Sequence, residues 1–185
     1  LSSVALLAGS ATFSFHRCAV RTNGEVYCWG GEPSRCAAGL EVTLPSVPKV
    51  VSGANGTWCA LLNNGEVQCW GNGAYGQLGH GQYVGYQRDL VAVTGLPPAI
   101  ALSSNGYSVC AVTATGGVWC WGHNEGGRLG LPLSTTQTAT PQPVPGLSGA
   151  TDIAVGDFYE TCAIRQGEVI CWGGGNETPR EIQFP

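Results

Sequence analysis

Apolar and polar positions alternate in short runs along this chain, and four of these runs share one pattern. Each run opens with Cys-Ala, passes through apolar positions to a polar centre that contains glycine, and returns through apolar positions to Cys-Trp-Gly. The copies begin at Cys18, Cys59, Cys110 and Cys162, so their starts are 41, 51 and 52 residues apart. Apolar runs around a glycine-containing centre are typical of two short strands and a turn. The pattern predicts four β-hairpins.

The spacing of the cysteines indicates how the two strands of each hairpin pair. If Cys18 faces Cys28, the glycine of the three-residue loop falls where such a loop favours a left-handed residue. The fourth copy is one residue shorter, yet pairing Cys162 with Cys171 leaves a permitted two-residue loop. The deletion therefore preserves the pairing. The predicted loops are Thr22–Gly24, Asn63–Gly65, Ala114–Gly116 and Gln166–Gly167.

Both faces of each predicted hairpin are substantially apolar. Because side chains alternate across a strand, Cys18 and Val20 lie on one face while Ala19 lies on the other. A sheet with two apolar faces must be covered on both sides, as happens when blades pack around a ring. We expect the tryptophan after the second cysteine of each copy to pack between blades: Trp29, Trp70, Trp121 and Trp172.

A further strand is expected ahead of each hairpin. Strand-like runs precede the hairpins at Val4–Ala8, Val50–Val51, Ile100–Leu102 and Ile153–Val155, and segments punctuated by proline follow them. We therefore predict an all-β fold of β-propeller-type repeats, with four blades in one repeat domain. The blades are expected over residues 1–48, 49–98, 99–149 and 150–185.

The repeated phrase resembles the regulator of chromosome condensation repeat family. The resemblance rests on Cys-Ala followed by Gly-x-Val-x-Cys-Trp-Gly, then on Tyr75–Gly79 and, more loosely, Gly127–Gly130. Residues 31–40 of the first copy depart from the family's Gly-Gln-Leu-Gly turn. The resemblance implies blades of about four antiparallel strands, usually seven in a ring. Four blades would therefore form part of a larger ring, a smaller ring or an assembly completed by another chain. Because the family includes an exchange factor, a photoreceptor and a secreted inhibitor, it does not assign an activity.

Composition narrows the classes of partner. The net charge is −4 and only eight Lys and Arg residues are spread along the chain, which disfavours nucleic acid as a partner. The apolar run Val4–Ala8 is too short to span a bilayer, so we expect no membrane insertion. The chain has no methionine and is expected to be a processed protein or a segment of a longer one.

Nine cysteines indicate the compartment. Four pairs at separations of 10, 10, 10 and 9 do not match zinc knuckles or redox motifs, but they match cross-strand disulfides. We prefer disulfides to reduced core thiols, and such bonds persist in an oxidising compartment, which predicts an extracellular or cell-surface location. The expected pairs are Cys18 with Cys28, Cys59 with Cys69, Cys110 with Cys120, and Cys162 with Cys171.

Cys36 and two sequons leave alternatives open. Cys36 is either a buried free thiol or a bridge to another segment or chain, and the bridge is slightly preferred. The Asn-x-Thr triplets at Asn55 and Asn176 are N-glycosylation sites or chance occurrences in loops. The Ser- and Thr-containing stretch Pro132–Pro145 is expected to be an exposed loop between blades, with O-linked sugar as the alternative.

No catalytic constellation is evident. His16, His80 and His123 lie at unrelated places in the repeat and are expected to be solvated or loop histidines. Asp152 and Asp157 are explained better as loop positions than as a carboxylate pair, as are Glu25 and Glu66. We therefore expect no enzyme activity, no cofactor and no metal site.

Two functions remain, both as a binder of proteins. The first is an extracellular structural or protein-interaction module within a larger glycoprotein assembly. The second is a secreted propeller that binds and inhibits, or recognises, a single protein partner. A lectin or a glycan-directed enzyme would need a site that the sequence does not show.

Overall fold

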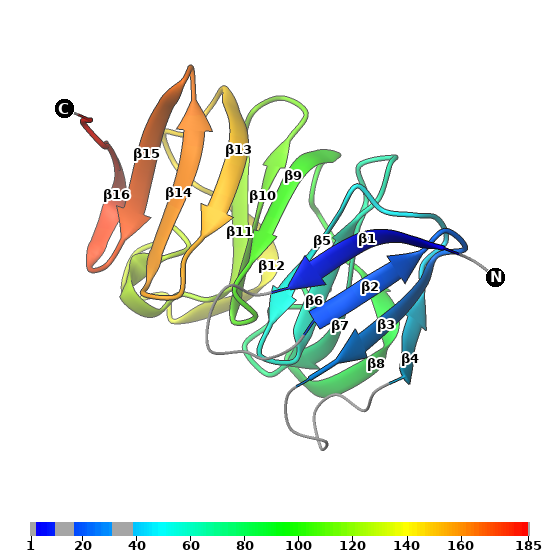
Figure 1. Ribbon diagram of the computed structural model, residues 1–185. Helices are drawn as coiled ribbons and strands as arrows, with labels where there is room; N and C mark the ends of the chain where they lie inside the picture. The colour runs from blue at the N-terminus through cyan, green and yellow to red at the C-terminus, as the bar shows by residue number, and fades with distance from the viewer. Residues whose placement is uncertain (1–2, 10–16, 31–38, 185) are drawn as a thin grey trace.

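A computed structural model describes residues 3–9, 17–30 and 39–184, with four antiparallel sheets in a row (Figure 1). The first sheet contains β1 (Val4–Gly9), β2 (Arg17–Arg21), β3 (Glu25–Trp29) and β4 (Gly39–Thr43). The second contains β5 (Val50–Ala54), β6 (Thr57–Leu61), β7 (Val67–Gly73) and β8 (Val84–Ala92). The third contains β9 (Ala99–Ser104), β10 (Ser108–Thr113), β11 (Val118–His123) and β12 (Gln137–Pro143). The fourth contains β13 (Ala150–Val155), β14 (Glu160–Arg165), β15 (Glu168–Gly173) and β16 (Asn176–Glu181), and a short 3-10 turn, η1 (Glu125–Gly127), follows β11.

Each sheet is a meander of four strands in chain order, which confirms the predicted all-β propeller blades. The first strands of neighbouring sheets contact one another: β1 lies against β5, β5 against β9, and β9 against β13. The first and last sheets lie at opposite ends of the row, as do the two chain ends (Figure 1). The fold is therefore an arc of blades with their first strands on the inner side.

The hairpins pair in the predicted register. Cys18 lies opposite Cys28 and Val20 opposite Val26, and the corresponding cysteines face each other in the other three sheets. Gly24 has a φ of 85°, as its place in the three-residue loop requires. Disulfide bonds join the four predicted pairs, Cys18–Cys28, Cys59–Cys69, Cys110–Cys120 and Cys162–Cys171.

The apolar cores lie between the sheets. One cluster of buried side chains joins the first and second sheets through Val20, Val42 and Trp70. A second joins the second and third sheets, and a third joins the third and fourth. Because neighbouring sheets cover each other, hairpins with two apolar faces are stabilised only within the row of blades.

Three of the four repeated tryptophans pack between blades as expected. Trp70, Trp121 and Trp172 are all at most 1% exposed. The expectation is wrong for Trp29, which is 43% exposed, because it lies on the end sheet. Trp58, which lies outside the repeated Cys-Trp-Gly positions, is also buried, in the cluster between the first and second sheets.

The stretch Pro132–Pro145 is not simply an exposed loop. It contains β12, which pairs with β11, and Ala139 within it is buried. Ahead of that strand, Asn124 Nδ2 donates hydrogen bonds to three backbone carbonyls, the shortest at 2.7 Å to Thr135. The sequence expectation was wrong because the prolines fall on an edge strand, where a missing N–H is tolerated.

No helix among the described residues is both long and apolar enough to cross a membrane.

Candidate functional site

A pocket of about 310 Å³ lies where loops from the second, third and fourth sheets meet. Tyr75 follows β7, Tyr107 lies in the turn between β9 and β10, and His123 ends β11. The remaining lining side chains come from the segment around η1 and from the turn between β13 and β14: Glu125, Arg128, Asp157 and Tyr159. Three phenol rings, an imidazole, two carboxyl groups and a guanidinium group therefore line one pocket.

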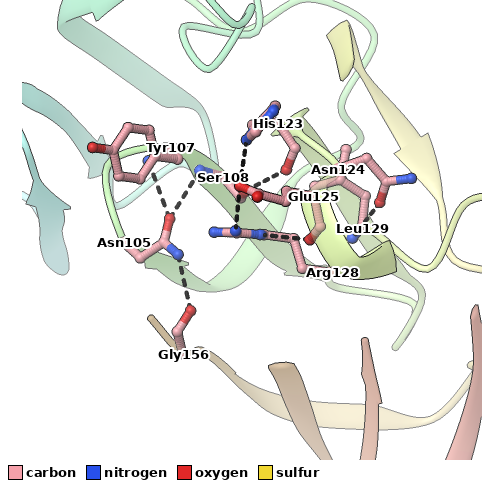
Figure 2. Close-up of polar contacts among 9 residues, drawn as sticks. All are labelled: Asn105, Tyr107, Ser108, His123, Asn124, Glu125, Arg128, Leu129 and Gly156. Carbon is pink, nitrogen blue, oxygen red and sulfur yellow. Dashed lines mark hydrogen bonds and ion pairs between the residues drawn. The ribbon is translucent and has the colours of Figure 1, made fainter. Parts of the chain in front are cut away.

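The turns that carry the pocket are linked from sheet to sheet. Asn55 Nδ2 donates to the carbonyl oxygen of Asn105 at 3.0 Å, and Asn105 Nδ2 donates to that of Gly156 at 2.9 Å. Asn105 Oδ1 also accepts from the backbone N–H groups of Tyr107 and Ser108 (Figure 2). These bonds fix the backbone of the turn that presents Tyr107 beside the turn of the fourth sheet.

Arg128 brings a buried positive charge to the pocket. Its side chain is 3% exposed, and its Nη2 lies 3.8 Å from Glu125 Oε2. The Nε group donates to the Glu125 carbonyl at 3.1 Å, and the guanidinium lies 4.7 Å from the centre of the Tyr159 ring. Burial lowers the pKa of Arg128, and the Glu125 carboxylate opposes this shift. Arg128 is therefore held by a carboxylate and an aromatic face, with little help from water.

The backbone of Arg128 also links the third blade to the fourth sheet through hydrogen bonds. Its carbonyl oxygen accepts hydrogen bonds at 2.9 Å from Trp172 Nε1 and from Thr161 Oγ1. In the turn between β7 and β8, the carbonyl of Gln77 accepts from Trp121 Nε1 in the same way, at 3.0 Å. The two positions are thus equivalent in the repeat, but Gln77 is neutral where Arg128 carries a charge. Of these two blades, the third has a guanidinium group at this position and the second does not.

His123 and Glu125 form the other side of the pocket. His123 Nδ1 lies 3.7 Å from Glu125 Oε2, the same oxygen that Arg128 approaches (Figure 2). The imidazole lies 4.5 Å from the Tyr75 ring, which in turn meets the Tyr107 ring edge-on at 6.0 Å. Burial lowers the pKa of His123, Glu125 opposes the shift, and Arg128 adds to it. The imidazole is therefore neutral at neutral pH.

Tyr159 adopts an unusual backbone conformation. Its φ is 67°, a region that a bulky residue rarely occupies. Its carbonyl lies so close to Gly173 that a Cβ on that glycine would approach within 2.0 Å of the oxygen. Strain of this kind persists only where the surroundings hold it, and it is frequent at functional sites. Here it sets the ring of Tyr159 beneath the guanidinium of Arg128.

The predicted site residues that the structure describes lie apart from this pocket. The eight paired cysteines lie inside the hairpins, and Cys36 and His16 lie outside the described residues. Asn176 is exposed at the start of β16, whereas Asn55 uses its Nδ2 in the bond to Asn105. In the described part of the chain, no three His, Cys, Asp or Glu side chains are grouped as metal ligands would be.

The expectation of a solvated or loop histidine is wrong for His123, which ends strand β11, whereas His80 lies in a loop as expected. His123 lines the pocket, and His80 Nδ1 is buried with no hydrogen-bond partner among the described residues. Asp157, expected as an ordinary loop position, also lines the pocket. The sequence signal that could have found this site is Arg128, which stands where the preceding repeat has a glutamine.

Family models and known proteins match these repeats in sequence. The pattern described as "Regulator of chromosome condensation (RCC1) repeat" matches residues 115–163, and a second form of it matches residues 49–77. The chain is 33% identical over 103 residues to the Drosophila melanogaster protein named regulator of chromosome condensation, a match covering 55% of the chain and 19% of that protein. It is 30% identical over 198 residues to human E3 ubiquitin-protein ligase HERC2, covering 92% of the chain and 4% of that protein.

Solved structures share the fold over nearly the whole chain. Yeast RCC1 (Prp20), crystallised with Kap60 bound, has a TM-score of 0.76 at 20% identity over 98% of the chain and 49% of its own. The ectodomain of the receptor kinase CR4 from Physcomitrella patens has a TM-score of 0.56 at 21% identity over 93% of the chain and 41% of its own. The chain thus spans half or less of these structures, and the likeness is one of fold.

Proposed function

Because the chain belongs to the regulator of chromosome condensation (RCC1) repeat family, whose propellers are protein-interaction modules, we propose that it binds protein partners in an oxidising, extracellular or cell-surface setting. The observation that carries the binding role is the pocket shared by loops of three blades. Loops held on a rigid sheet scaffold are where binding residues concentrate. The proposed role is binding without catalysis. The ligase activity named for HERC2 is not proposed for this chain, because the chain spans 4% of that protein.

Three observations support the extracellular setting. Four hairpins each hold a disulfide, and such bonds persist where the environment is oxidising. Asn176, in the second sequon, is exposed and open to a glycan. The CR4 structure is an ectodomain with the same fold.

The two forms of the proposal differ in the partner. Exposed apolar side chains at the two ends of the row, such as Leu7 in β1 and Phe184 after β16, favour a module within a larger assembly. A discrete pocket on one loop face favours recognition of a single protein, as in the alternative of a secreted inhibitor or receptor.

Capture from the secreted fraction of the source organism tests the binding role. We expect the wild-type chain to retain a partner that Tyr107→Ala loses, because Tyr107 is an exposed ring of the pocket. Tyr83→Ala is the control, since Tyr83 is also exposed but does not line the pocket. A partner retained by both variants would contradict binding at this face. One stoichiometric soluble partner would favour the inhibitor or receptor, and incorporation into insoluble material would favour the assembly.

The setting is tested on the protein from its natural source. We expect peptide mapping without reduction to show the four disulfides, and a glycan at Asn176. Free thiols at these eight cysteines in rapidly alkylated material would contradict the extracellular setting.

A further inference from the structure

The aromatic rings of the pocket leave open surface beside its carboxylates. Tyr107 and Tyr159 are 40% and 39% exposed, although both lie in turns of the third and fourth sheets that are joined by hydrogen bonds. An aromatic ring is negative over its face and attracts a cation placed there. The site already contains one such contact, since Arg128 lies over Tyr159. The rings are thus arranged in a way that suits positive charge.

The charges of the pocket sum to negative. Glu125 and Asp157 contribute two carboxylates, and Arg128 contributes one guanidinium beside a neutral His123. Glu125 lies within ion-pair distance of Arg128 and offsets its charge. Asp157 forms no ion pair within 4 Å in the described part of the chain, although it acts on Arg128 at longer range. One carboxylate is therefore left to attract a ligand.

We propose that this pocket binds a basic side chain, lysine or arginine, of a protein partner, with its cation between the Asp157 carboxylate and the exposed tyrosine rings. The inference rests on the proposed protein-binding function and names the chemistry that the partner must present.

An anionic ligand fits the pocket less well. The Arg128 side chain makes one hydrogen bond within the described chain, from Nε; its Nη groups make none, although the side chain is only 3% exposed. An anion that reached them would also meet the carboxylates of Glu125 and Asp157. A basic side chain avoids this conflict, because its cation faces the carboxylates.

Saturation-transfer NMR with short capped peptides of one length tests the inference. The peptides carry arginine, lysine, citrulline or glutamate at one central position and are otherwise identical. We expect the arginine and lysine peptides to bind more tightly than the citrulline peptide, which has nearly the shape of arginine without its charge. We expect the glutamate peptide to bind most weakly, and added salt to weaken the basic peptides.

Two matched variants locate the binding. Asp157→Asn removes the unpaired carboxylate with little change of shape and is expected to weaken the arginine peptide by up to about fivefold, the effect of one ion pair near the surface. Glu66→Gln removes an exposed carboxylate that lines a second pocket of about 330 Å³ beside the β6–β7 turn, and it is expected to have no effect. Matching thermal transitions of the two variants would show that both remain folded.

Three outcomes would overturn the inference. These are equal binding of the arginine and citrulline peptides, equal effects of Asp157→Asn and Glu66→Gln, or tighter binding of free agmatine than of the arginine peptide. The last would assign the pocket to a free cation. If no peptide binds while Tyr107→Ala still abolishes capture of a partner, the proposed function stands and the basic side chain is the wrong chemistry.

Discussion

Trp121 Nε1 donates a hydrogen bond to the backbone carbonyl of Gln77 at 3.0 Å, across the boundary between the second and third sheets. Trp172 makes the equivalent bond to Arg128 across the next boundary. Each tryptophan thereby ties its own blade to the glycine-rich turn of the blade before it. The repeat unit is thus linked to its neighbour by a specific polar bond inside an apolar interface.

Trp121→Phe should lower the free energy of unfolding by about 1 to 3 kcal/mol, because it leaves the buried Gln77 carbonyl without a donor and removes part of the indole. Urea denaturation measures the change. Trp119→Phe in the same strand is the control, since Trp119 is partly exposed and should change stability by no more than about 0.5 kcal/mol. Equal losses in the two variants would contradict a specific role for the bond between blades.

Removing one hairpin disulfide should weaken the fold measurably. Cys110→Ala with Cys120→Ala is expected to lower the free energy of unfolding by about 2 to 3 kcal/mol, since the bond closes a short loop whose freedom the unfolded chain regains. Denaturation with and without reductant measures this, and the reduced wild type should lose more than the oxidised double variant. Peptide mapping that linked cysteines of different copies would contradict the pairing.

His123 should make stability depend on pH. Burial lowers its pKa in the folded chain below the ordinary 6.5, so folding favours the neutral imidazole. The stabilising contribution is complete above pH 6.5 and is lost as the pH falls through the folded-state pKa. Denaturation from neutral pH to about pH 5 should show this loss, and His123→Gln should reduce the slope. An NMR titration of His123 with a pKa above 6.5 would contradict the prediction.

The 185-residue chain expressed alone should self-associate. Apolar side chains are exposed on both end sheets, with Leu7 72% and Trp29 43% exposed on the first and Ile164 40% exposed on the last. Apolar surface of this kind favours association. Light scattering after size exclusion, under oxidising conditions, measures the mass.

Cys36→Ser should remove any disulfide-linked fraction of that assembly, as judged on gels without reductant. The variant tests whether Cys36 bridges chains, since this residue lies outside the described part of the structure. A compact monomer whose Cys36 is alkylated in the native state would contradict both parts of this expectation.

The hairpins could be predicted because their determinants are local. A strand places side chains on alternate faces, so the spacing of Cys162 and Cys171 and the glycine of the Gln166–Gly167 loop together specify one register. The same local logic identified the burial of Trp121, because a residue on an apolar face of a blade must be covered. Composition and repeat length then indicated a propeller without any knowledge of long-range contacts.

Only the tertiary structure decided which side chains meet. Tyr75, Arg128 and Tyr159 belong to three loops far apart in the chain, and the stacking of the blades brings them to one pocket. No periodic pattern in the sequence predicts that these side chains lie together, because loop conformation depends on hydrogen bonds between turns, such as that from Asn105 to Gly156. The exposure of Trp29 was decided in the same way: its neighbours on the strand predict burial, but coverage depends on whether another sheet lies against that face.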